Sequence, residues 1–191
     1  VASPAAVLNI TGAADKELTH GSQGFNGSVL TNSGSIFWLG TGKIKLGDGA
    51  QIVNQLSFVA QNHAILGYNG FGNVPLFNNQ GSFTKIASGG TTRVEIPFAN
   101  SGTILVNSGT LRFTSSFTHT GGFITLSNNA TVWFDQGLSF PTGILAGVGT
   151  IEGNVSNGGT ISPGTPVGSL VIDGNLIVGN QLGAGGVTVT F

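Results

Sequence analysis

Histidine and cysteine are the side chains that most readily hold a metal ion or act as nucleophiles, and this chain has few of them. It contains three histidines, His20, His63 and His119, and no cysteine. None of the histidines follows the H-x-x-H or H-E-x-x-H spacing that places two imidazoles on one zinc ion. The lack of cysteine excludes thiolate ligands and a disulfide framework. We therefore expect no metal and no cofactor, and histidines that face solvent or lie at strand edges.

Paired carboxylates are the second possible source of catalysis. The seven Asp and Glu residues are scattered singly along the chain. Arg93 and Arg112 are 19 residues apart, so stacked repeats of about that length would bring Arg93, Glu95 and Arg112 together. This spacing favours a salt bridge or ladder between repeats. The alternative is a carbohydrate-binding or carbohydrate-cleaving face. We predict no catalytic residue and a protein that is not an enzyme.

Three kinds of binding motif that contain glycine or threonine are incomplete in this chain. Residues 147–149 and 158–159 lack the Asp of calcium-binding repeats, and residues 183–186 lack the Lys-Ser/Thr of a phosphate loop. A Thr-rich face of the ice-binding kind needs Thr-x-Thr repeated from coil to coil. Only residues 188–190 fit that pattern cleanly, so the repetition is missing.

Composition limits the class of protein further. Charged residues make up 7% of the chain, net charge is −1, and 33 of 191 residues are glycine. Such a chain has no electrostatic footprint for nucleic acid or anionic membranes. It also contains no apolar run of the roughly 20 residues that span a bilayer. Its composition disfavours helices and suits many short strands joined by tight turns.

The elements that would position any site are revealed by a repeat. Residues 98–117 read F-A-N-S-G-T-I-L-V-N-S-G-T-L-R-F-T-S-S-F, in which a polar turn, a glycine and an alternating apolar run occur twice. The phrase recurs around Gly81, Gly102 and Gly122, in steps of 21 and 20 residues. Alternation indicates strands, and this period is typical of a β-solenoid. We predict an all-β, single-domain parallel β-helix with 20–21 residues and two to three short strands per coil.

Within this plan we distinguish an N-terminal strand or cap (1–23), the solenoid (24–178), and a Gly-rich connector with a terminal strand (179–191). The turn-dense segment 67–75 predicts a protruding loop, whose Tyr68 and Phe71 are the candidate partner contacts. Trp38 and Trp133 lie in strand phrases and are expected in the core or in a groove.

The run L-x-G-x-G-T-I-x-G-N-V-x-N-G-G-T-I-S-P-G-x-x-x-G-S-L-x-I-x-G-N-L resembles the parallel β-helix repeats of bacterial autotransporter passengers and related adhesin-like exported proteins. The resemblance is close over residues 143–178 and looser over 24–142. It implies a right-handed helix and an exported, extracellular or cell-surface protein. That family scaffolds adhesins, proteases, toxins and fibres alike, so the resemblance specifies no activity. We expect a passenger-like fragment or a free exported protein, with the small residues at its start left by signal-peptide removal.

The two ends of a solenoid expose strand edges, which can pair with another chain. We therefore hypothesise a non-enzymatic structural protein that assembles end to end into a surface or matrix fibre, with itself as the main partner. An adhesin-type module of a larger surface protein is the first alternative, and a carbohydrate-binding or carbohydrate-cleaving β-helix is the second. The cell surface or a polysaccharide is a further possible partner, whereas nucleic acid and membrane insertion are not expected. The candidate assembly residues are Val7, Leu8, Ile10, Val187, Val189 and Phe191.

Overall fold

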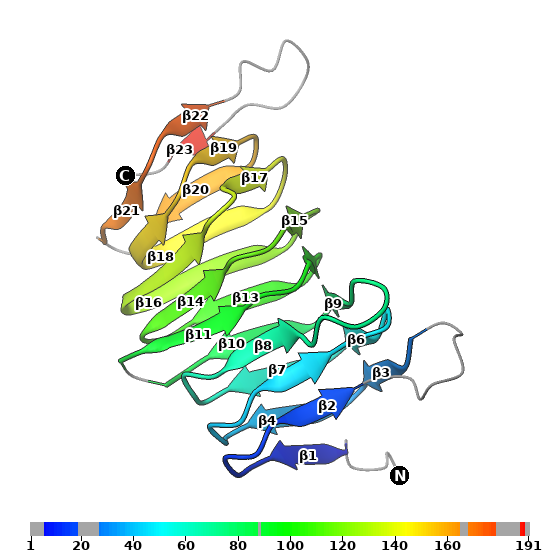
Figure 1. The fold of residues 1–191 in the computed structure, drawn as a ribbon. Helices are drawn as coiled ribbons and strands as arrows, with labels where there is room; N and C mark the ends of the chain where they lie inside the picture. Colours follow the sequence, from blue (N-terminus) through cyan, green and yellow to red (C-terminus); the bar gives the residue numbers. More distant parts are fainter. Residues whose placement is uncertain (1–5, 19–26, 88, 165–167, 179–187, 190–191) are drawn as a thin grey trace, which may run out of the picture.

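The computed structural model describes residues 6–18, 27–87, 89–164, 168–178 and 188–189. These residues form 23 strands and no helix, and every strand pair is parallel. The strands stack into a β-solenoid of about seven turns with about 21 residues per turn (Figure 1). The predicted fold class and repeat length are therefore confirmed.

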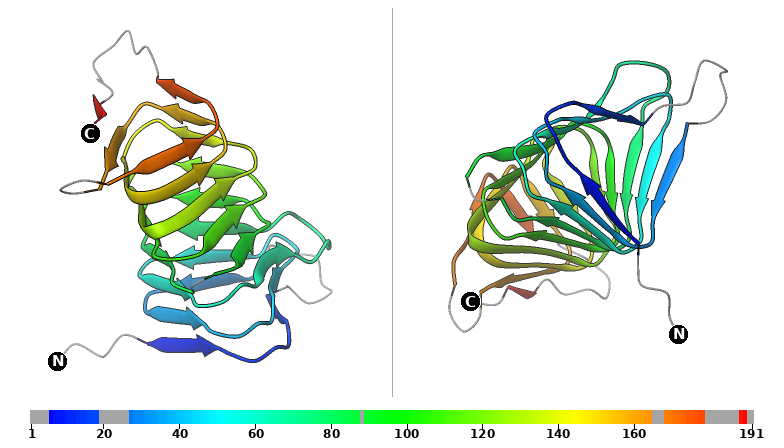
Figure 2. Two further views of the ribbon diagram at one scale, coloured as in Figure 1. Left: turned by 90° about the vertical axis from the view of Figure 1, so that its left-hand side faces the viewer. Right: turned by 90° about the horizontal axis from the view of Figure 1, so that it is seen from below.

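Each complete coil has three sides, as the end-on view in Figure 2 shows. A 15-stranded sheet provides two of the sides because it bends at a corner. The side that we call the neutral face contains β1 (Val7–Ile10), β4 (Ser35–Trp38), β7 (Ser57–Ala60), β10 (Ser82–Lys85), β13 (Thr103–Val106), the first parts of β16 (Phe123–Phe134) and β18 (Ile144–Glu152), β20 (Thr160–Pro163) and β23 (Thr188–Val189).

The second side, which we call the charged face, contains β2 (Lys16–Leu18), β5 (Ile44–Leu46), β8 (Ile65–Tyr68), β11 (Thr91–Val94), β14 (Thr110–Phe113), the last parts of β16 and β18, and β21 (Leu170–Asp173). The third face contains two separate sheets: β3 (Val29–Asn32), β6 (Gln51–Asn54), β9 (Leu76–Asn79), β12 (Phe98–Asn100) and β15 (Phe117–His119), followed by β17 (Leu138–Phe140), β19 (Val155–Asn157) and β22 (Leu176–Val178).

The doubled phrase of residues 98–117 contributes β13 and β14, which do not form a hairpin. β13 pairs with β10 and β16, and β14 pairs with β11 and β16. Its two glycines serve different purposes. A Cβ on Gly102 would lie 2.1 Å from the carbonyl oxygen of Gly81 in the coil before, whereas Gly109 has a φ of +70° at the corner. Both positions therefore favour glycine, the first through close coil packing and the second through backbone conformation.

The core lies inside the coils and is dominated by phenylalanine. In-register strands stack the rings of Phe58 and Phe83, with centroids 5.3 Å apart, and those of Phe77 and Phe98, at 4.8 Å. Alternation fixes this arrangement, since most strands bury every second residue.

The N-terminal segment already belongs to the stack, because β1 pairs with β4 and β2 pairs with β5. The predicted loop begins slightly later than expected, since Gly67 and Tyr68 are part of β8. Residues 69–75 then protrude between β8 and β9 (Figures 1 and 2).

Candidate functional site

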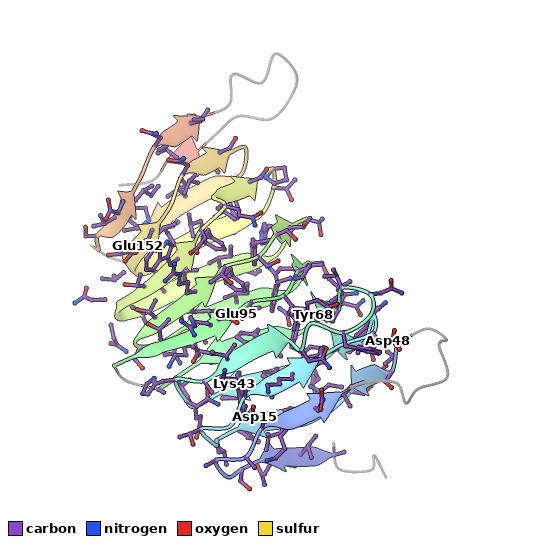
Figure 3. All side chains as sticks on the ribbon, in the orientation of Figure 1. Asp15, Lys43, Asp48, Tyr68, Glu95 and Glu152 are labelled. Atoms are coloured by element: carbon purple, nitrogen blue, oxygen red, sulfur yellow. The ribbon has the colours of Figure 1, made fainter. Side chains whose placement is uncertain are left out.

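Charged residues gather on one side of the solenoid. Of the 13 in the chain, Lys85 alone lies away from the charged face; the other twelve are on its strands or within two residues of them. These are Asp15, Lys16, Glu17, Lys43, Lys45, Asp48, Arg93, Glu95, Arg112, Asp135, Glu152 and Asp173. Figure 3 shows Asp15, Lys43, Glu95 and Glu152 following one side of the stack. This face is the candidate functional surface.

Parallel register organises the charged face into columns. Arg93 pairs with Arg112, Arg112 with Trp133, Trp133 with Glu152, and Glu152 with Asp173. Arg112 is the centre of this column because its guanidinium donates to both carboxylate oxygens of Asp135, at 2.8 and 2.9 Å. Its Cζ also lies 3.6 Å from the centroid of the Trp133 ring. The hydrogen bond to Asp135 raises the pKa of Arg112.

Arg93 lies beside Arg112 on the neighbouring coil, as predicted, and Glu95 is close to Arg93. Each arginine, however, forms its ion pair with a different carboxylate. Arg93 Nε lies 3.2 Å from Glu95, which directly follows the strand of Arg93, while Arg112 bonds Asp135 in the next coil. These groups are partly exposed, and such pairs contribute roughly 0–1 kcal/mol each. A salt bridge between coils is therefore present, but it joins Arg112 to Asp135, whereas Arg93 and Glu95 pair within one coil.

The first coils carry a third charged pair. Lys45 Nζ lies 2.9 Å from Asp15, which also accepts the backbone N–H of Lys43 at 2.9 Å. The hydrogen bond from Lys45 lowers the pKa of Asp15, and the same bond raises the pKa of Lys45. Both groups are exposed, so this pair is a surface feature of the face.

A threonine column runs beside the charges, contrary to the expectation that no coil-to-coil threonine repetition exists. Thr91, Thr110, Thr131 and Thr150 are in register on successive coils. The adjacent outward column holds arginine, tryptophan and glutamate, so this surface is not the double threonine array that the ice-binding pattern requires.

Inside the third face, asparagine side chains form a ladder. Asn32 Nδ2 donates to Asn54 Oδ1, Asn54 to Asn79, and Asn79 to Asn100, each at 2.7 Å. Each of these four asparagines also donates to a backbone carbonyl oxygen, which lies near the corner of the next coil or of its own coil. The ladder was missed because N-x-G indicates a turn and does not reveal which way the asparagine points.

His119 ends this ladder, and the prediction of an exposed or edge histidine is wrong for it. The residue is 2% exposed, and the Asn100 amide approaches its Nδ1 at 3.0 Å. Because the Asn100 Nδ2 can only donate, Nδ1 must accept and Nε2 must carry the proton. Nε2 is buried with no hydrogen-bond partner among the described residues. Burial lowers the pKa of His119 to about 4.

Lys85 is the buried cation of the chain. Its Nζ donates to the carbonyl oxygens of Asn62 and Ala87, at 3.0 and 2.9 Å, and burial lowers its pKa to about 8. It is fully inaccessible to solvent, so a substrate cannot reach it. We interpret Lys85 as a structural residue. Its ammonium group lies inside the coil and holds the corner by binding backbone carbonyl oxygens of the loops.

The remaining predicted residues are dispersed. Trp38 is buried, and its Nε1 donates to Gly42 at 3.1 Å, whereas Trp133 faces outward. On the protruding loop, Phe71 is 67% exposed, while the Tyr68 hydroxyl donates to the Gly72 carbonyl and its ring packs on the core.

The candidate assembly residues lie on end strands where they are described. Val7 and Leu8 are exposed and Ile10 is partly buried. Val189 pairs with Ile161 through the backbone. Val187 and Phe191 lie outside the described residues, as does His20.

The described residues contain no group of three or more His, Asp or Glu side chains that could hold a metal ion. In the same part of the chain, no helix is long and apolar enough to cross a membrane. In comparisons with known proteins, the chain matches no family model, no curated protein and no solved structure.

Proposed function

We propose that the chain is a non-enzymatic, extracellular structural protein whose β-solenoid joins end to end with further copies into a surface or matrix fibre. The observation that carries this proposal is the character of the end coils. In the described part of the chain, β1 pairs only with β4, and β22 pairs only with β19, so each has an unpaired strand edge.

These end strands also expose apolar side chains. Val7 is 62% exposed and Leu8 is 47% exposed on β1, while all three residues of β22 are exposed. Beside β1, the core opens into a hollow of about 300 Å³ lined by residues that include Ile10, Leu30 and Phe58. Apolar edges of this kind favour strand addition. A second copy matches them because its opposite end continues the same parallel, three-sided stack.

The first alternative is an adhesin-type module in a longer surface protein. Exposed Phe71 and Val74 on the loop of residues 69–75 favour this reading, since large apolar side chains on a projecting loop suit contact with a partner. In that case the same end strands would pair with further coils of one chain, and the isolated chain would not polymerise.

Sedimentation and electron microscopy of the purified chain over a range of concentrations test the proposal. We expect filaments for the natural sequence. Leu8→Lys and Ile177→Lys should abolish them, because an inserted charge blocks an edge strand. Thr131→Lys, on a side wall in the middle of the stack, is the control and should still form filaments. A strictly monomeric population at high concentration would overturn the proposal.

A further inference from the structure

The neutral face differs from the charged face in having no charged side chain on its outward positions throughout the described coils. Strand by strand, the first and third residues point outward and the second and fourth point inward. The single charged residue on these strands is Lys85, which points inward and is buried. A chain with 13 charges thus leaves the outward surface of this wall uncharged over the described coils.

Outward residues of the neutral face are hydroxyl-bearing or apolar, except for Asn9 on β1. One column pairs Ser35 with Ser57, Ser57 with Ser82, and Ser82 with Thr103. Apolar side chains stand among them, and Phe123 is 47% exposed. The hydroxyls of Ser82 and Thr84 lie 3.3 Å apart and bond to each other. Such a surface can be covered without removing a charge from water, which would otherwise be costly.

The third face also lacks outward charges, but it is less suited to a flat contact. Its strands form two separate sheets, with a break between β15 and β17, and the loop of residues 69–75 leads directly into it. The neutral face is continuous, since β1, β4, β7, β10, β13, β16, β18 and β20 pair in unbroken succession.

We propose that the neutral face binds the neutral face of a second copy of this chain, sheet against sheet. Side chains on this wall repeat with the strand spacing of about 4.8 Å. A partner that interdigitates along the whole wall needs the same spacing, and a second copy has it. Two-fold pairing is self-complementary, and it brings no like charges together because neither surface is charged. Interface centres are depleted in charged residues in the same way.

The wall is small, which sets the expected strength. Eight strands at about 4.8 Å and four residues at about 3.3 Å give roughly 500 Å² per copy. Stable interfaces bury about 800 Å² per partner, so a single pair should be weak and concentration-dependent. In an end-to-end fibre the contacts would add along the length and join neighbouring fibres side by side. The pairing itself does not require the fibre.

Because the chain has no cysteine, single-cysteine variants can report each wall separately. Thr103, Thr110 and Ala99 lie on one middle coil, on the neutral, charged and third faces respectively, and all three are half-buried. We would treat Thr103→Cys, Thr110→Cys and Ala99→Cys with a short bis-maleimide, normalising each rate to reaction with a mono-maleimide. Thr103→Cys should give covalent dimers at least tenfold faster than the other two. Adding Leu105→Lys to Thr103→Cys should lower its rate to theirs.

End-to-end contacts cannot produce this result, because the middle coil is several strand spacings from either end. Equal rates for the three variants, a faster rate for Thr110→Cys or Ala99→Cys, or no effect of Leu105→Lys would overturn the neutral-face proposal. None of these results depends on whether filaments form.

Discussion

At the scale of single residues, His119 is where the asparagine ladder meets a group that can change its charge. Asn100 donates to Nδ1, so protonating the imidazole would place two donors against each other. It would also leave a cation in the core, between Asn100 and the ring of Phe140, whose centroid lies 4.9 Å away. The described contacts of His119 include no carboxylate that would compensate this charge.

This environment predicts an acid-sensitive stability. The folded protein keeps His119 neutral down to a pKa of about 4, whereas the unfolded chain binds the proton near the ordinary value of 6.5. The contribution of His119 is therefore complete above pH 6.5 and is lost as pH falls towards 4, by roughly 3 kcal/mol. Urea midpoints between pH 7.5 and 4.5 measure it. His119→Asn should flatten this dependence, because asparagine extends the ladder.

His63→Asn is the matched control, since His63 is exposed. Other groups titrate in the same range, so the effect of His119 is measured as the difference in pH dependence between the two variants. If His119→Asn kept the full dependence of the natural sequence, the buried neutral histidine would not be its source.

At the scale of the strand, β9 shows how alternation separates structure from surface. Asn78 and Asn79 are neighbours of the same type, but Asn78 faces outward and Asn79 is fully buried. Asn79 accepts from Asn54 and donates to Asn100 and to the backbone of Thr103. Asn79→Ala should lower the free energy of unfolding by about 2–4 kcal/mol, because it leaves buried partners unsatisfied. Asn78→Ala should change it by less than about 0.5 kcal/mol. Denaturant titration of both variants would contradict this view if their losses were equal.

The length of the coil could be predicted from the sequence because the glycines at one corner recur once per coil. Gly81, Gly102 and Gly122 must lie one above another, since a Cβ at Gly102 or Gly122 would collide with the coil before it. Their spacing therefore reports the turn directly. The parallel arrangement followed from recurrence on both sides of residues 98–117, and the pairing of β13 with β10 and β16 confirms it.

What could not be predicted was the direction of individual side chains. Asn100 and Asn107 begin identical N-S-G-T phrases, yet Asn100 points into the ladder and Asn107 lies partly exposed at the other corner. For the same reason, the burial of Lys85 and His119 could not be predicted from the sequence. Segregation of charge was equally hidden, because it appears only once each strand is assigned to one of three walls.

At the scale of the whole molecule, the solenoid is a one-dimensional stack in which each coil touches only its neighbours. Stability in such a stack is approximately a sum of coil and interface contributions. In the described structure, middle coils have two neighbours and end coils have one. Amide hydrogen exchange at low concentration should therefore be slowest in β10, β13 and β14, and fastest in β1 and β22.

Amide hydrogen exchange also tests whether copies of the chain join end to end. If copies join end to end, protection of β1 and β22 should rise with protein concentration, because their free edges gain backbone partners, while β13 should not change. Protection that rose equally everywhere would indicate a general stabilisation and not edge pairing. Ends as well protected as β13 in a monomeric sample would show that the stack unfolds as one cooperative unit, contradicting the additive description.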